Sequence, residues 1–144
     1  MQIESIEIRN YRLFRHAELK DLPRLTLVIG PNGSGKSTLF DAFSFLKDAL
    51  ARNFSAAVAL RGGFRELVSR GERGPIGIMV KFRESGGRLV TYQLNVAEQA
   101  GRPVVDREVL KIRRGQRGKP RHLVDFSRGE GTAVTNESAM VKKV

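Results

Sequence analysis

The 144-residue sequence contains no cysteine, which excludes disulfide bonds and metal sites built from thiolates. Its start, Met1-Gln2-Ile3-Glu4, lacks the basic segment and the apolar segment of a secretory signal. No stretch approaches 18 consecutive apolar residues, the length that a membrane-spanning helix requires. We therefore expect a soluble cytoplasmic protein that does not interact with a membrane.

Acidic residues are also scarce: 15 Asp and Glu stand against 26 Lys and Arg, so the net charge is +11. The excess is concentrated in residues 102–128, which hold nine basic residues and three acidic ones. Such an excess attracts polyanions at long range, but it also occurs on solvated strand faces. Contact with DNA or RNA through residues 102–128 and a solvated or partner-facing surface are both open interpretations.

The most informative stretch is residues 30–38, Gly-Pro-Asn-Gly-Ser-Gly-Lys-Ser-Thr, which matches the phosphate-binding pattern G-x-x-x-x-G-K-[ST]. The continuous apolar run at residues 25–29 predicts a buried parallel strand before the loop. Apolar residues at helical spacing predict a helix over residues 36–52 after it. A strand, a glycine loop and a helix are the context that this motif requires. The charged positions expected on the outer face of the helix are Asp41, Lys47, Asp48 and Arg52.

Residue types in this loop favour the binding of a nucleotide phosphate chain. Glycine lets backbone approach a phosphate closely, and successive N–H groups at a helix N-terminus form a nest for anions. We expect Lys36 to reach the β- and γ-phosphates as the catalytic residue, Ser37 to ligate Mg²⁺, and Thr38 to lie near the α-phosphate. The predicted nucleotide-binding residues of the loop are Gly30, Asn32, Gly33, Ser34, Gly35, Lys36, Ser37 and Thr38.

Outside the loop, the pattern is mainly that of β-strands. Apolar and polar residues alternate in six segments, two of which form a β-hairpin around the turn at residues 84–87. Residues 53–60 predict either a short helix or a loop. The glycine- and arginine-rich residues 61–71 predict either a loop at the nucleotide or partner or a plain surface connection. The predicted strands are 6–9, 16–20, 76–83, 90–96, 104–113 and 121–126.

One element of a complete phosphate-loop enzyme is missing from the pattern. Such enzymes hold Mg²⁺ with an acidic residue at the end of a second buried strand. Asp106 and Asp125 follow only short, alternating segments, so neither fits this role. We interpret residues 1–128 as the nucleotide-binding lobe of an ATPase and residues 129–144 as a polar tail or truncation point.

Residues 8–14, Ile-Arg-Asn-Tyr-Arg-Leu-Phe, followed by the loop at 30–38, resemble the start of SMC, RecF and OLD-like ATPases. These are ATP-binding-cassette-type heads, also described as AAA-domain ATPases. The resemblance implies an incomplete α/β P-loop NTPase fold: the first lobe of the head, with a parallel core strand, one main helix and an antiparallel β-meander. It also implies that the nucleotide is ATP and that Arg12, Phe14 or Arg15 contacts its adenine or phosphates.

The resemblance further implies partners and activities. Family heads carry a Q-loop glutamine, for which Gln93 is the candidate here, and a signature motif and Walker B acid that have no counterpart. The full protein would hydrolyse ATP with a second lobe or in a head-to-head homodimer, in DNA maintenance or phage defence. Whether this chain is itself an enzyme stays open. The alternatives are a non-enzymatic nucleic-acid-binding module acting through residues 102–128 and a small-molecule kinase.

Overall fold

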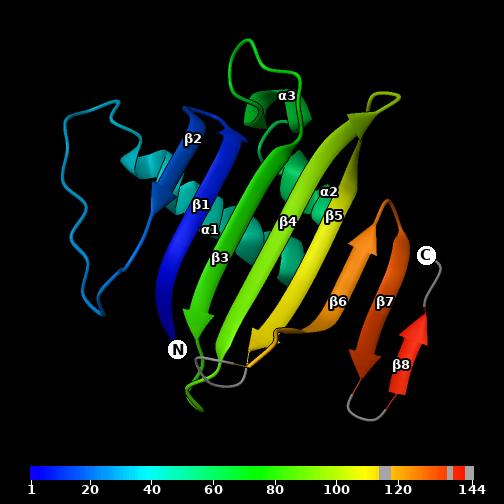
Figure 1. Cartoon of the computed structure of the whole chain (residues 1–144). Coiled ribbons are helices and arrows are strands. Elements are labelled where there is room, and N and C mark those ends of the chain that lie inside the picture. Colours follow the sequence, from blue (N-terminus) through cyan, green and yellow to red (C-terminus); the bar gives the residue numbers. More distant parts are fainter. Residues whose placement is uncertain (114–117, 136–137, 142–144) are drawn as a thin grey trace.

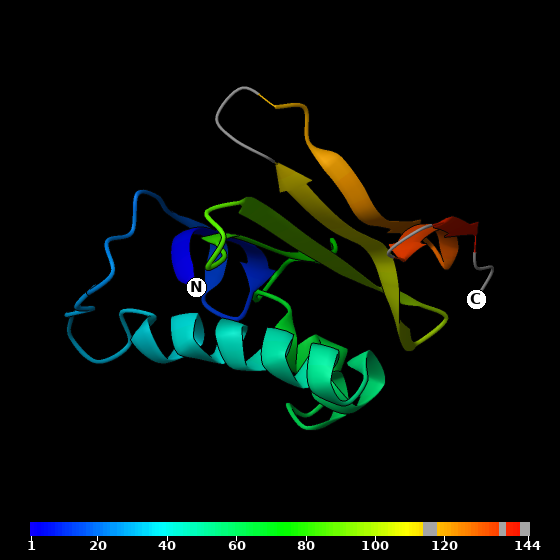
Figure 2. The same cartoon turned by 90° about the horizontal axis from the view of Figure 1, so that it is seen from below.

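An antiparallel sheet of eight strands carries the chain, and the helices lie against one of its faces (Figures 1 and 2). The computed structural model describes residues 1–113, 118–135 and 138–141. The strand order is β2-β1-β3-β4-β5-β6-β7-β8, so every strand after β2 extends the sheet in one direction. The strands are β1 (Gln2–Tyr11), β2 (Phe14–Leu19), β3 (Ile76–Arg83), β4 (Leu89–Gln99), β5 (Arg102–Arg113), β6 (Arg121–Ser127), β7 (Glu130–Thr135) and β8 (Ser138–Val141).

Alternation of apolar and polar residues sets which face of the sheet is buried. Ile8 pairs with Ile78, and Ile78 pairs with Leu94, so three aliphatic side chains form one row across β1, β3 and β4. All three are buried on the face that the helices cover. The strands expected at 6–9, 76–83, 90–96, 104–113 and 121–126 are confirmed as parts of β1 and β3 to β6, and the one expected at 16–20 is confirmed except for Lys20, because β2 ends at Leu19.

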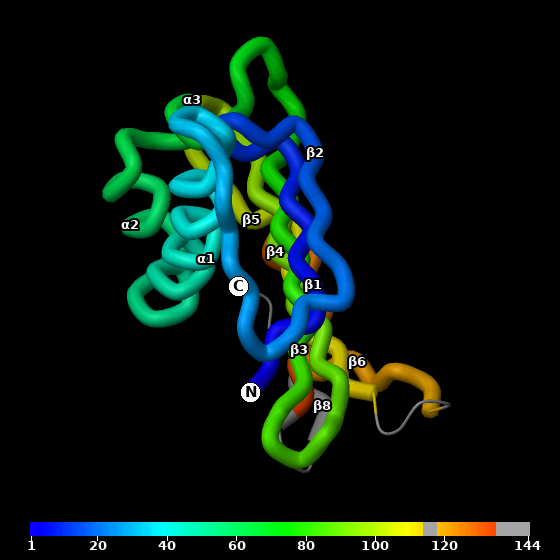
Figure 3. The backbone as a smooth tube through the Cα atoms, turned by 90° about the vertical axis from the view of Figure 1, so that its left-hand side faces the viewer, coloured from blue at the N-terminus to red at the C-terminus, as the bar shows by residue number. Residues whose placement is uncertain are grey.

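The helical layer consists of α1 (Lys36–Ala51), α2 (Phe54–Ala59) and α3 (Phe64–Leu67), which Figure 3 shows on one side of the sheet. The apolar face of α1 buries Ala42 and Phe45 completely, which confirms the helix predicted over 36–52. Residues 53–60 contain a helix rather than a loop, because the side chain of Asn53 caps α2 by accepting a bond of 2.7 Å from Ala56 N–H. In the described ranges, no helix has both the length and the apolar composition to cross a membrane.

The parallel core strand expected at residues 25–29 does not form. This segment has no regular secondary structure, and Leu25, Leu27 and Ile29 are 88%, 79% and 82% exposed. Figure 1 shows it in the loop that projects beyond β2. A strand requires a hydrogen-bonded neighbour, and every strand pairing in the described residues is antiparallel and leaves out this segment. The apolar run alone therefore does not produce a strand.

The expectation of a polar tail at residues 129–144 also differs from the structure, which contains β7 and β8 there. The turn between β6 and β7 explains the difference. Ser127 pairs with Glu130, so only Arg128 and Gly129 form the loop, and their φ angles are 50° and 83°. Two successive positive φ angles are typical of the two-residue turns that close β-hairpins. This turn allows β7 to add to the sheet although its sequence is polar.

Candidate nucleotide-binding site

Two glycines of the loop at 30–38, Gly33 and Gly35, have positive φ angles that strain a larger residue, and Gly30 and Gly35 lie close to neighbouring side chains. Gly35 has φ 94° and directly precedes α1. A Cβ atom added to Gly35 would lie 2.6 Å from the Phe14 ring, and one added to Gly30 would lie 2.6 Å from Ser34 Oγ. Gly33 also has a positive φ, 82°, in open space. The loop therefore closes tightly at the N-terminus of α1, where backbone N–H groups favour an anion.

Lys36 bends back over this loop. Its Nζ donates to the carbonyl oxygens of Gly30, at 2.5 Å, and Pro31, at 2.7 Å, and lies 3.4 Å from Ser34 Oγ. The ammonium group is therefore held at the loop, where a bound phosphate chain would meet it. The Ser37 side chain is exposed at the same end of α1, whereas Thr38 is buried.

The turn between β1 and β2 is fixed against the phosphate loop by contacts from the segment around α3. Arg12 has a positive φ of 50°, and its backbone N–H donates to Leu67 O at 2.6 Å. The buried hydroxyl of Ser69 donates to Phe14 O at 2.9 Å. Because the Phe14 ring also lies against Gly35, these bonds place the turn beside the start of α1.

A basic cleft of about 890 Å³ opens between this turn, α3 and the start of α1. It brings together two residues that the sequence predicted, Arg12 and Arg15, with Thr38. Arg65, Ser69 and Arg70 also line it and were not singled out from the sequence, although residues 61–71 had been interpreted as a possible nucleotide loop. Glu66 lines the cleft as well, and three of its four arginines, Arg12, Arg15 and Arg65, lie within ion-pair distance of Asp41, Glu72 and Glu98. Guanidinium groups are nevertheless donors that suit phosphate oxygens.

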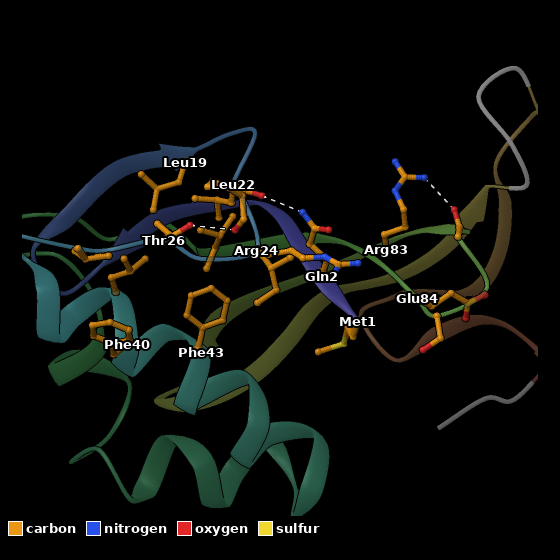
Figure 4. Close-up of a pocket in the computed structure, with 17 residues that line it drawn as sticks. Met1, Gln2, Leu19, Leu22, Arg24, Thr26, Phe40, Phe43, Arg83 and Glu84 are labelled. Atoms are coloured by element: carbon orange, nitrogen blue, oxygen red, sulfur yellow. Dashed lines mark hydrogen bonds between the residues drawn. The ribbon is translucent and has the colours of Figure 1, made fainter.

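A second cleft, of about 930 Å³, lies between the N-terminal half of β1, the segment of residues 22–28 and α1 (Figure 4). Leu22, Phe40 and Phe43 line it, and Figure 4 shows Phe40 and Phe43 extending from α1 toward the segment of residues 22–28. None of residues 30–38 lines this cleft. Arg24, Arg83 and Glu84 also line it, so apolar and charged side chains share this cleft.

Three other candidates from the sequence lie away from the loop. Asp106 is paired with Arg128 at 3.2 Å, and Asp125 lies 2.7 Å from His122, both on β5 and β6 at the far side of β3 and β4. Gln93 pairs with Met79 in the middle of β4, in the row opposite to the one that the helices cover, so it does not join the site. The described residues contain no group of three or more His, Cys, Asp or Glu that could bind a metal ion.

Comparison with known proteins identifies the family of the chain. The model of the AAA ATPase domain family matches residues 1–130. The chain belongs to the AAA ATPase domain family. This confirms the resemblance to SMC- and RecF-type ATPases on which the sequence interpretation of the ATPase rests.

The names of curated relatives of this AAA ATPase domain refer to DNA replication, DNA repair or chromosome partition. The chain is 39% identical to the DNA replication and repair protein RecF of Magnetococcus marinus over 42% of the chain and 16% of RecF. It is 37% identical to the chromosome partition protein Smc of Methanocaldococcus jannaschii over 44% of the chain and 6% of Smc. It is 30% identical to the DNA double-strand break repair Rad50 ATPase of Pyrococcus abyssi over 65% of the chain and 10% of Rad50. The chain thus spans a small part of these relatives.

Proposed function

We propose that the chain is the ATP-binding lobe of an ATPase related to RecF, Smc and Rad50. The observation that carries this proposal is the position of Lys36, whose ammonium group is held over a glycine loop at the N-terminus of α1. Nests of backbone N–H groups with such a lysine bind the β- and γ-phosphates of nucleotides. Membership of the AAA ATPase domain family supports ATP as the nucleotide.

Residues around the loop take complementary roles in this proposal. Lys36 contacts the β- and γ-phosphates in this proposal, and Arg12 and Arg15 contact the phosphates or adenine; their position in the lining of the basic cleft beside Thr38 supports this role. The backbone of Gly30, Asn32, Gly33, Ser34 and Gly35 surrounds the phosphate chain, and Thr38 follows at the start of α1. Mg²⁺ fits beside Ser37, because its exposed hydroxyl is free to join phosphate oxygens and water as ligands. The ion would neutralise phosphate charge during transfer.

Hydrolysis is proposed to need a second lobe. Asp106 and Asp125 are engaged in ion pairs and lie far along the sheet from the loop, so neither supplies a carboxylate to Mg²⁺. The exposed residues 25–29 and the second cleft, which Thr26 and Val28 line, would be covered if a second lobe added a parallel strand there. The completed protein, alone or as a head-to-head homodimer, would then hydrolyse ATP in DNA maintenance or phage defence.

Calorimetric titration with Mg-ATPγS tests the proposal. The chain is expected to bind the nucleotide, and Lys36→Ala is expected to abolish binding. Lys47→Ala is the matched control, because Lys47 is an exposed lysine on the same helix and does not line the basic cleft. Equal binding by the parent and Lys36→Ala, or no binding by a chain that circular dichroism shows to be folded, would contradict the proposal.

A second candidate function is nucleic-acid binding through the basic strands at 102–128. Lys81 and Lys111 lie in one row, each paired with Thr91, on the face of the sheet opposite the helices. The neighbouring Arg107 and Arg128 are already paired with Asp125 and Asp106, which reduces the free positive charge. This function predicts DNA binding that weakens steeply with salt and that Lys36→Ala does not change. Residues 114–117, in the basic turn, lie outside the described residues.

A further inference from the structure

Donors from three segments of the chain meet at the carboxylate of Asp41, which lies one helical turn after Thr38 on α1. The Tyr11 hydroxyl donates to Asp41 Oδ2 at 2.6 Å, and Arg12 Nε lies 2.9 Å from the same oxygen. Arg61 Nε donates to Asp41 Oδ1 at 3.0 Å. The sequence places Asp41 among the charged positions on the outer face of the helix. Instead, it links the helix of the phosphate loop to β1, to the β1–β2 turn and to the segment between α2 and α3.

The two arginines depend on Asp41 to different degrees. Arg61 is 8% exposed, and it also donates to Asp48 Oδ2 at 2.9 Å and to Ala57 O at 3.0 Å. Arg12 is 37% exposed, and Asp41 is the only carboxylate within ion-pair distance of it in the described residues. Loss of the Asp41 charge would therefore leave Arg61 in place and release the side chain of Arg12.

The position of Arg12 gives this difference a functional meaning. Its backbone is fixed by the bond to Leu67 O, and its side chain lines the basic cleft together with Thr38. We propose that Asp41 is a positioning residue that orders the Arg12 side chain for contact with the bound nucleotide. This inference rests on the proposed ATP-binding function. Burial and the bond to Asp41 raise the pKa of the Tyr11 hydroxyl above its ordinary value, so this hydroxyl is protonated and able to donate near neutral pH.

The Asp41 charge has two opposite effects on nucleotide affinity. The direction in which Asp41→Asn changes the Kd therefore shows which effect is larger. Ordering Arg12 in advance removes the entropic cost of fixing it on binding, an effect of about 2- to 10-fold in Kd for one arginine. The negative charge of Asp41 also repels the phosphates. If repulsion dominated, Asp41→Asn would bind nucleotide more tightly than the parent chain. The positioning role predicts weaker binding.

The experiment measures the Kd of Mg-ATPγS by calorimetry for the parent, Asp41→Asn and Asp48→Asn. Asp41→Asn is expected to weaken binding about 2- to 10-fold, within the range given by the ordering of one side chain. Asp48→Asn is the matched control, because it removes the other carboxylate of Arg61 on the same helix without touching Arg12. In an Arg12→Ala background, Asp41→Asn is expected to have no further effect. A purely structural role of Asp41 would persist in that background.

The outcomes separate this inference from the proposed function. If the parent binds and Asp41→Asn matches Asp48→Asn or binds more tightly, the positioning role is overturned and ATP binding stands. If the parent binds no better than Lys36→Ala, the proposed function fails and the positioning role fails with it. If Asp41→Asn does not fold, Arg12→Lys retains the charge but lacks the Nε that contacts Asp41. It is expected to weaken binding as well, and affinity equal to that of the parent would overturn the inference.

Discussion

Replacing Gly35 by alanine tests the phosphate loop at its tightest point. Gly35 has φ 94°, and an added Cβ atom would lie 2.6 Å and 2.7 Å from two atoms of the Phe14 ring. Gly33 is a matched control within the same loop. Its φ of 82° is similar, but an added Cβ atom would meet nothing within 4 Å. The two substitutions therefore share the backbone strain and differ in the steric clash.

The expected magnitudes follow from these two contributions. A non-glycine residue in the left-handed region costs about 1–2 kcal/mol. Displacing a packed ring to admit an additional carbon costs about 1–3 kcal/mol more. Gly33→Ala is therefore expected to lower the free energy of unfolding by about 1–2 kcal/mol, and Gly35→Ala by about 2–5 kcal/mol.

Urea unfolding followed by circular dichroism measures both values, and a third variant isolates the clash. Phe14→Ala removes the ring, so adding Gly35→Ala to it is expected to cost only the backbone strain, about 1–2 kcal/mol, as at Gly33. The described packing of the β1–β2 turn against the phosphate loop would be refuted by either of two results. One is equal stability of Gly35→Ala and Gly33→Ala, and the other is a cost of Gly35→Ala that stays the same in the Phe14→Ala background.

Three further predictions test other parts of the structure by urea unfolding. Ser69→Ala removes the buried hydroxyl that donates to Phe14 O and is expected to lower the free energy of unfolding by about 1 kcal/mol. Ser44→Ala, at an exposed serine, is expected to lower it by less than about 0.5 kcal/mol, and equal losses would contradict the bond from Ser69. Leu27→Ser, at a side chain 79% exposed, is expected to cost under about 0.5 kcal/mol, whereas Leu67→Ala, fully buried, is expected to cost about 2–5; a large loss at Leu27 would place residues 25–29 in the core. Burial raises the pKa of Glu7, but bonds from a neighbouring arginine and histidine outweigh it and lower the pKa below its usual value. Stability from Glu7 is therefore present above the pKa of an unfolded glutamate and is lost as pH falls through the lower folded value. Glu7→Gln is expected to reduce the loss of the free energy of unfolding between these two pH values. An unchanged loss would contradict the shift.

The elements predicted correctly from sequence are those whose burial follows a local period. The alternation in β3 and β4 places every second side chain on the face that the helices cover, and the apolar spacing in α1 places Ala42 and Phe45 on the same core. The glycine pattern also indicated the local backbone of the loop, because Gly33 and Gly35 adopt the positive φ angles that glycine allows. In these cases neighbouring residues along the chain carry the structural information.

Features that depend on distant partners were not predictable in this way. Residues 25–29 have the composition of a buried strand, but no neighbour in the described residues pairs with them. Asp41 was placed among the charged positions on the outer face of the helix, because nothing near it in sequence indicates that Tyr11 and Arg61 would converge on it. The hairpin of β6 and β7 was missed because the signal lies in the turn at Arg128 rather than in its polar strands.

The most direct test of ATP binding by this loop is an amide NMR titration of the chain with Mg-ATPγS. The account predicts that the largest shifts occur at Gly33, Gly35, Lys36 and Ser37, whose backbone N–H groups would surround the phosphates, and that Lys36→Ala removes these shifts. Shifts confined to residues 102–113 of the basic strands, or none in a folded chain, would contradict the assignment of the site.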